Sequence, residues 1–251
     1  MKAAGFYDLK QAFAEPGCAL CRLLIDHADG YIQATLWELV NDIDGRVELN
    51  KARGYCNPHA WMLVRHGASL GAAILMDNIV LVAMREMEKA KFETQPGFSL
   101  RQMFGALGSA QPSGATAGLV EALGPQTHCP VCVAVDKSED YFLTALINHL
   151  AAVDGLAEYY KKSDGLCLPH LRKALARVSN ETTYNALIEA QMAVWTDLRA
   201  HLAEFIRKKD HRFTGEKIGE EGDSWLRGIE AVSGAQQVRR DKPVKSGKKS
   251  K

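Results

Sequence analysis

Two short phrases in this sequence combine the residue types that bind transition metals. "GYCNPH" (54–59) and "GLCLPH" (165–170) share one Gly-x-Cys-x-Pro-His pattern, and the cysteine of each phrase follows a Cys-x2-Cys pair after 34 intervening residues. Three thiolates and one imidazole are the donor set of a tetrahedral Cys3His zinc site, and two residues between ligands let both side chains of a pair face one ion. The sequence therefore predicts two zinc sites, whose ligands are Cys18, Cys21, Cys56, His59, Cys129, Cys132, Cys167 and His170.

These ligand sets use all six cysteines of the chain and leave none over. Each Cys-x2-Cys pair also stands where a helix is expected to begin, at "EPGC" and "THCP". Each Cys-x2-His pair is expected to begin another helix, at "GYC" and "GLC". The free N–H groups and the positive dipole end of a helix N-terminus favour a thiolate. We expect each site to form within its own half of the chain, with a mixed site that draws one pair from each half as the alternative.

Other uses of the same residues compete with zinc. Three cysteines and one histidine can also hold an iron–sulfur cluster. "CPVC" (129–132) at a helix start is chemically similar to a dithiol redox motif, although no βαβ pattern surrounds it. A di-iron carboxylate bundle is excluded, because none of the eight histidines has a glutamate three residues before it. Buried structural cysteines would leave the equal spacing of the two sets unexplained.

The two sets are related by a constant offset of 111 residues. Cys18 falls on Cys129, Gly54 on Gly165 and His59 on His170 without any gap. The residues of special chemical type account for most of the identities, so we interpret the pattern as a tandem duplication.

The segments that position these ligands are all predicted to be helices. Apolar residues recur near the 3.6-residue period in 18–42, 70–92, 129–152 and 181–209, and no run shows the two-residue alternation of a strand. Pro58 suits the first turn of a helix over 56–67. "DIDG" (42–45) is expected to break the first helix. The predicted fold class is all-α, a tandem duplication of a helical module in which each module carries one Cys3His site.

The predicted boundaries follow from composition. We expect a first helical repeat over 1–93, a linker over 94–127 that holds six glycines and three prolines, and a second helical repeat over 128–210. A C-terminal extension over 211–235 would contain a short helix at "SWLRGIEAV", and a basic tail follows over 236–251. At most a short helix, near "SLRQMFGAL", is expected in the linker.

The charge distribution and the hydropathy of the chain limit the classes of partner that we expect. The formal net charge is +1, yet residues 239–251 hold seven Lys or Arg and one Asp. Such a tail is typical of a solvated end that makes weak contacts with nucleic acid or another polyanion. The N-terminal residues lack the apolar run of a signal peptide, and "LGAAILMDNIVLVAM" (70–84) is too short to span a bilayer. We expect a cytoplasmic protein with no membrane contact.

With these motifs in view, the sequence resembles an uncharacterised bacterial family, a domain of unknown function. The shared features are a Cys-Pro-x-Cys helix start, a phrase similar to "LWELVND", a "GFCxxH" phrase, a second copy of the unit and a phrase like "FIRKKDHRFTGEKIGEEGDSW" (205–225). The resemblance covers about residues 1–230. This chain departs from it at Ala19, where the family has proline, and at Tyr55, where it has phenylalanine. The resemblance implies that the eight ligand positions are characteristic of the family, and it implies no activity.

The function expected from the sequence is that of a zinc-binding, two-module helical protein, an interaction or regulatory scaffold with a protein partner and not an enzyme. The alternative is an iron–sulfur or dithiol redox protein that uses the same Cys and His sets.

Overall fold

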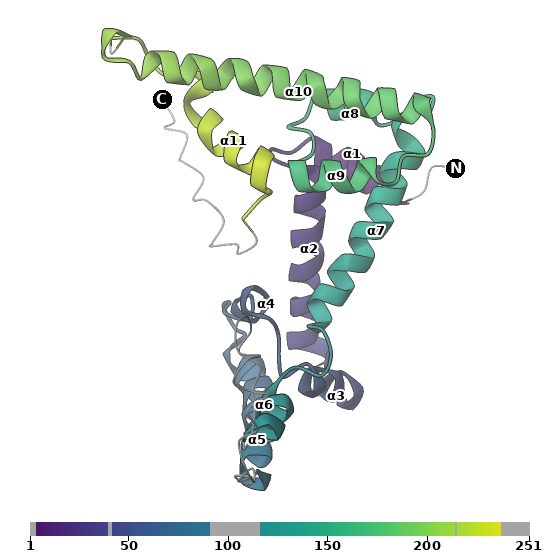
Figure 1. Ribbon diagram of the computed structural model, residues 1–251, viewed down its shortest axis with the longest axis vertical. Coiled ribbons are helices and arrows are strands. Elements are labelled where there is room, and N and C mark those ends of the chain that lie inside the picture. Colours follow the sequence, from purple (N-terminus) through teal and green to yellow (C-terminus); the bar gives the residue numbers. More distant parts are fainter. Residues whose placement is uncertain (1–3, 40–41, 91–115, 214, 237–251) are drawn as a thin grey trace, which may run out of the picture. The chain divides into compact units, whose positions relative to one another are not determined.

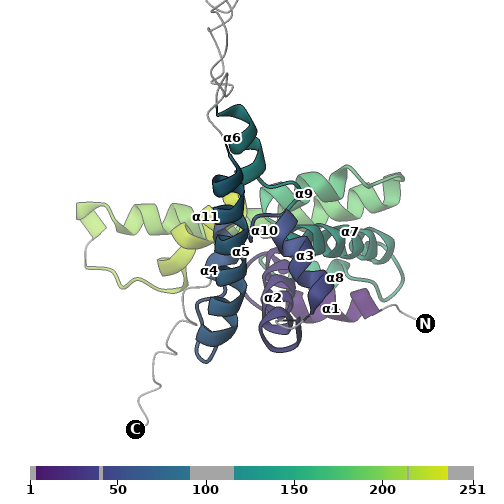
Figure 2. The same ribbon diagram turned by 90° about the horizontal axis from the view of Figure 1, so that it is seen from below.

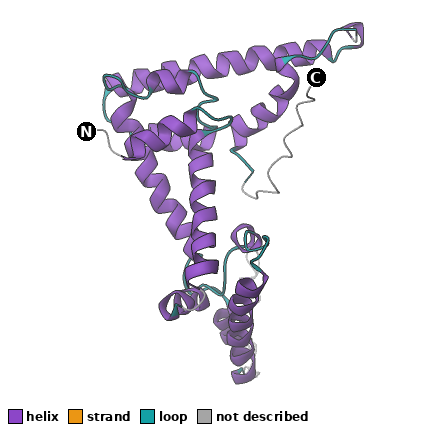
Figure 3. Cartoon of the chain, turned by 180° about the vertical axis from the view of Figure 1, so that it is seen from behind, coloured by secondary structure: helices purple, strands orange, loops and turns teal. Residues whose placement is uncertain are grey.

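The computed structural model describes residues 4–39, 42–90, 116–213 and 215–236. All regular elements in these ranges are helical and none is a strand, which confirms the predicted all-α class (Figure 3). None of the described helices combines the length and the apolar content needed to cross a lipid bilayer. The predicted helix at 99–107 and almost all of the predicted basic tail lie outside the described residues.

The chain forms two compact units, and the first of them combines residues 1–29 with residues 134–251. The second unit is the continuous stretch 30–133. Helices α2 (Ala19–Ala34) and α7 (Pro130–Leu150) each have residues in both units. The units therefore follow a different division of the chain from the expected repeats, 1–93 and 128–210.

The first unit contains most of the helices (Figure 1). In it, α10 packs on α8 and α11, and α11 in turn packs on α9. Its elements besides the parts of α2 and α7 are α1 (Ala4–Phe13), α8 (Ala157–Lys161), α9 (Leu168–Leu175), α10 (Glu181–Lys208), η2 (His211–Phe213), η3 (Glu220–Asp223) and α11 (Ser224–Ser233).

A single apolar core holds the first unit together. Leu9 of α1, Leu20 of α2 and Leu146 of α7 are fully buried in it, as is Tyr160 of α8. The buried ligand residue Cys167 belongs to the same cluster. Burial of these side chains supplies the main favourable term for folding of this unit.

The second unit is smaller and has fewer buried side chains. It contains η1 (Thr35–Leu39), α3 (Ile43–Lys51), α4 (Asn57–Trp61), α5 (Ser69–Lys89) and α6 (Ala117–Leu123). Helix α5 packs on α3 and α6 (Figure 2). Within α5 only Leu75 is buried, while the apolar side chains of Val80 and Met84 are about half exposed. Since its apolar core is small, this unit depends on other interactions for its stability.

Four helix predictions differ from the structure. The Asp42 side chain accepts hydrogen bonds from the N–H groups of Asp44 and Gly45, so "DIDG" begins helix α3 as an N-cap and does not act only as a breaker. Helix α6 forms within the stretch expected to be a linker, and α1 was not anticipated. The helix predicted over 56–67 is shorter in the structure, since α4 (Asn57–Trp61) ends at Trp61. Helices α5, α7, α10 and α11 form close to their predicted ranges.

Candidate metal centres

The structure gathers the eight predicted ligands into two groups, and each group lies within one unit. The ligand atoms of a group lie within 4.8 Å of one another. The first centre, in the first unit, contains Cys18, Cys21, Cys167 and His170. The second centre, in the second unit, contains Cys56, His59, Cys129 and Cys132.

The expectation that each site forms within its own half is therefore wrong, and the mixed alternative is correct. Each centre combines the Cys-x2-Cys pair of one half with the Cys-x2-His pair of the other. Helix length explains the exchange. The 16 residues of α2 carry the chain roughly 24 Å away from Cys18, and the 21 residues of α7 carry it roughly 32 Å away from Cys129, at 1.5 Å per residue.

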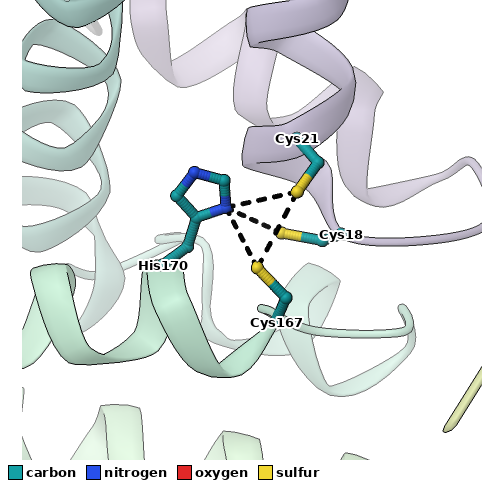
Figure 4. A group of neighbouring side chains, drawn as sticks. All are labelled: Cys18, Cys21, Cys167 and His170. Carbon is teal, nitrogen blue, oxygen red and sulfur yellow. Dashed lines mark hydrogen bonds between the residues drawn. The ribbon is translucent and has the colours of Figure 1, made fainter. Parts of the chain in front are cut away.

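The first centre is compact and buried (Figure 4). The Nδ1 atom of His170 lies 3.2 Å from Cys167 Sγ, 3.4 Å from Cys18 Sγ and 3.4 Å from Cys21 Sγ. The sulfurs of Cys21 and Cys167 are 3.7 Å apart. All four donor atoms thus point toward one small volume between the start of α2 and the start of α9.

Two polar contacts fix the loops that carry the ligands of the first centre. Asp164 Oδ2 accepts a hydrogen bond of 2.7 Å from the N–H of Gly17, next to Cys18. The buried side chain of Gln191 pairs with both backbone groups of Leu166, next to Cys167, at 3.2 Å for each bond. The hydroxyl of Tyr160 donates to the same Gln191 oxygen. These contacts hold the ligand-bearing backbone in place.

The electrostatics of the first centre favour a cation. Burial lowers the pKa of His170, but the sulfurs of Cys167, Cys18 and Cys21 outweigh it and raise that pKa to about 12. In the metal-free chain, His170 therefore holds its proton more tightly than a free imidazole does. A metal ion must displace this proton, so its affinity falls as the pH falls.

The second centre has the same donor set with more solvent access. His59 Nδ1 lies 3.1 Å from Cys56 Sγ, 3.4 Å from Cys132 Sγ and 3.6 Å from Cys129 Sγ. The sulfurs of Cys56 and Cys132 are 3.6 Å apart. All four residues are half-buried, whereas those of the first centre are buried.

The two thiols of "CPVC" differ strongly in acidity. Burial raises the pKa of Cys129, but hydrogen bonds from His59 and from the N–H groups of Cys56, Cys132 and Val131 lower it to about 6 on balance. Burial and the neighbouring sulfurs of Cys56 and Cys129 raise the pKa of Cys132 to about 12. In the metal-free chain, Cys129 is therefore the thiolate of this pair at neutral pH.

The predicted position of the ligands at helix starts is confirmed. Cys18 directly precedes α2, and Cys129 directly precedes α7. Cys56 and Cys167 are the N-cap residues of α4 and α9, with nearly equal backbone angles (φ −63° and ψ 161° against φ −68° and ψ 158°).

The glycines before these N-caps are required by the backbone. Gly54 has φ +98° and Gly165 has φ +68°, a region that residues with a Cβ rarely adopt. Each Gly-x-Cys-x-Pro-His phrase is thus a left-handed turn followed by a helix start, with the proline in the first turn.

The geometry fits a single tetrahedral ion in each centre. Zinc bonds of about 2.3 Å to sulfur and about 2.0 Å to nitrogen imply tetrahedral edges of about 3.8 Å between sulfurs and about 3.5 Å between sulfur and nitrogen. In the structure one sulfur–sulfur edge is 3.7 Å in the first centre and 3.6 Å in the second, the edges between sulfur and Nδ1 are 3.1 to 3.6 Å, and all donor atoms of a centre lie within 4.8 Å of one another. The residues present can therefore hold a metal ion at both places.

Sequence reasoning missed the residues that support the ligands. Glu139 on α7 lies 3.1 Å from His170 Nε2, and Gln191 on α10 binds the backbone beside Cys167. Neither residue belongs to a motif. Gln191 stands in the largely apolar run "ALIEAQMAVW" (186–195), which is a weak signal, whereas Glu139 stands in the polar run "DKSED" (136–140) and gives no such signal. His128, the residue directly before Cys129, is exposed and belongs to neither centre.

Comparison with known proteins places the chain in a family. A family model described as a family of unknown function (DUF6062) matches residues 7–239, and the chain belongs to this family. No curated protein and no solved structure matches the sequence.

Proposed function

We propose that this member of the DUF6062 family is a zinc protein, in which two Cys3His centres fasten helices into a scaffold for interaction with other proteins. The observation that carries this proposal is the convergence of three sulfurs and one Nδ1 atom at two separate places. Zinc favours this donor set in a tetrahedral arrangement, and a closed set of four protein ligands is typical of a structural site.

Each centre would join segments that are far apart in the sequence. The first joins the start of α2 to the start of α9, and the second joins the start of α7 to α4. The second unit has few buried side chains of its own, so its metal ion would supply a large part of its stability. A scaffold that needs a fixed helix arrangement gains it from such cross-links.

The donor set also argues for a structural rather than a catalytic metal. A catalytic zinc keeps one position open for water or substrate, with three protein ligands. Here four protein donors surround each place. We therefore assign the metal no catalytic step, and its chemistry is to bind three thiolates and one imidazole at once.

Metal analysis and a visible spectrum test this proposal. Protein purified without oxygen should contain two zinc ions per chain and show no colour, and cobalt(II) substitution should give the absorption of a tetrahedral sulfur-rich site. Cys167→Ser should remove one ion. His128→Ala is the matched control, since His128 belongs to neither centre. A brown protein with iron and labile sulfide would contradict the zinc assignment.

Removal of the metal distinguishes a structural from a catalytic ion. Chelation should lower the thermal unfolding temperature and increase the exchange of backbone amides around Cys56 and Cys129, because the second unit loses its cross-link. A chelated protein that keeps its stability and its amide protection would rule out the structural role.

A thiol-redox function is the second candidate, and the lowered pKa of Cys129 favours it. It predicts reversible formation of a disulfide between Cys129 and Cys132 in cells. Recovery of zinc-loaded chain with both thiols reduced would count against it.

The basic residues at the C-terminus suggest a second kind of partner. Seven Lys or Arg against one Asp in 239–251 favour weak, salt-dependent binding of polyanions. Heparin binding should disappear when residues 236–251 are deleted, and binding that persists would contradict this role of the tail.

A further inference from the structure

Glu139 is a buried carboxylate beside the first centre. It belongs to α7, and 8% of its surface is exposed. Its Oε1 atom lies 3.1 Å from His170 Nε2, and both of its oxygens accept hydrogen bonds from Lys173 Nζ, at 2.6 and 2.7 Å. A buried carboxylate is costly unless it is paired, and here it is paired twice.

The contact with Glu139 determines which nitrogen of His170 faces the sulfurs. A hydrogen bond to a carboxylate requires a proton on Nε2, and in a neutral imidazole the lone pair then lies on Nδ1. Nδ1 is the atom that points at the three sulfurs (Figure 4). A carboxylate behind a ligating histidine fixes its orientation and makes it a stronger donor.

Lys173 completes this arrangement by balancing charge. One zinc ion and three thiolates leave one net negative charge, and Glu139 adds a second close to them. The Lys173 ammonium compensates for that second charge at 2.6 Å. The ion pair with Lys173 therefore reduces the repulsion between the carboxylate and the anionic centre.

The second centre has no such support in the part of the chain that the structure describes. The contacts of His59 there are those of Nδ1 with the three cysteines, and no carboxylate or carbonyl oxygen lies at its Nε2. The residue 111 positions before Glu139 is Ala28, so the counterpart in the first half lacks a carboxylate. The ligands of the second centre are also more exposed.

We propose that Glu139 is a positioning residue that holds His170 as an Nδ1 ligand and makes the first centre bind its metal more tightly than the second. This inference rests on the proposed function, because it requires a metal ion in both centres. It assigns different roles to the two centres: the first retains its ion, and the second exchanges its ion with the surroundings.

Chelator competition on the full chain tests this assignment. Zinc should leave the wild-type protein in two steps, the second centre first, and the steps are assigned with Cys129→Ser and Cys18→Ser. Glu139→Ala should weaken zinc binding at the first centre by about 10- to 100-fold, the range found when such supporting residues are lost. Glu139→Gln keeps an acceptor oxygen without the charge and should recover part of the loss. Asp140→Asn is the matched control, since Asp140 is the next residue of the same helix and pairs with Arg177 on the surface.

A nitrogen NMR measurement separates positioning from a general loss of packing. In the zinc-loaded wild type, His170 should coordinate through Nδ1 and show a slowly exchanging proton on Nε2. In Glu139→Ala that proton should exchange faster, while His59 stays unchanged.

Failure of this inference can be distinguished from failure of the proposed function. Two ions of equal affinity, or a first centre that Glu139→Ala leaves unchanged, would overturn this inference alone. A wild-type chain that binds no metal would overturn the proposed function and this inference with it.

Discussion

The backbone N–H of Ala235 donates a hydrogen bond to the sulfur of Cys21, at 3.4 Å between the two atoms. These residues are 214 positions apart, so the end of the described chain returns to the start of α2. Gly234, just before Ala235, adopts φ +87°, and a Cβ there would lie 3.5 Å from Cys21 Sγ and 3.7 Å from Cys167 Sγ. The segment that follows α11 therefore covers the first centre, and an N–H directed at a thiolate sulfur stabilises its charge.

We predict that Ala235→Pro speeds the release of zinc from the first centre, because proline has no N–H to donate. Ala235→Ser keeps the N–H and is the control. The measurement is the rate of zinc transfer to a coloured chelator. Equal rates for the two variants would show that the hydrogen bond to Cys21 has no effect on the metal.

Gln191→Leu is predicted to destabilise the first unit. Leucine has a similar size but leaves the N–H and the C=O of Leu166 without partners in a buried place. An unsatisfied buried group costs about 1–3 kcal/mol, so the free energy of unfolding of the zinc-loaded protein should fall by at least that amount in urea titrations. Gln11→Leu, at an exposed position of α1, should change it little. A similar stability for both variants would contradict the role of Gln191.

In the metal-free protein, Cys129 is predicted to be the first cysteine of the second centre to react with iodoacetamide. Its pKa is lowered to about 6, so it is a thiolate at pH 7 and its reaction should slow as the pH falls through 6. Cys132, with its pKa raised to about 12, should stay a thiol over that range. Mass spectrometry of the labelled peptides gives the order of reaction. His59→Ala removes a hydrogen bond that lowers the pKa of Cys129, so it should move the midpoint upward, and an unchanged midpoint would refute that cause.

The contact between Glu221 and Lys208 is predicted to make stability depend on pH at the acid end. Glu221 accepts hydrogen bonds from Lys208 Nζ at 2.8 Å and from the N–H of Gly219 at 2.9 Å, and these lower its pKa to about 2. Because the folded-state pKa lies below the ordinary value, the contribution is fully present above about pH 4.5. It is lost as the pH falls toward 2.

Urea unfolding of the wild type and Glu221→Gln at several pH values measures this effect. The wild type should be more stable at pH 7, and the difference should shrink below pH 4.5. Both proteins lose metal together in acid, so the difference between them reports on Glu221. A difference that stays constant down to pH 2 would exclude this carboxylate as its source.

The ligand positions and most helices could be predicted from the sequence, because both depend on local patterns. Cys56 and His59 stand three apart at a helix start, and the apolar period of 70–92 and 181–209 marks α5 and α10. The partners of each pair could not be predicted, because the 35-residue spacing is compatible with either arrangement. The structure shows which pairs meet: α2 and α7 separate each Cys-x2-Cys pair from the Cys-x2-His pair of its own half.

The residues that support the ligands could not be predicted from the sequence for a related reason. Glu139 and Gln191 act through contacts with residues 31 and 25 positions away, which no local period records. Asp and Gly occur both where helices end and where they begin, so "DIDG" alone does not distinguish a breaker from an N-cap. The hydrogen bonds from the N–H groups of α3 to Asp42 show that it is an N-cap.

Zinc content of two double variants tests the pairing of the centres most directly. Cys18 and Cys167 belong to one centre here, while Cys18 and Cys56 belong to different centres. We predict that the double variant Cys18→Ser/Cys167→Ser keeps one zinc ion per chain and that Cys18→Ser/Cys56→Ser keeps none. The reverse result, with zinc lost from the first variant and one ion kept by the second, would contradict the account.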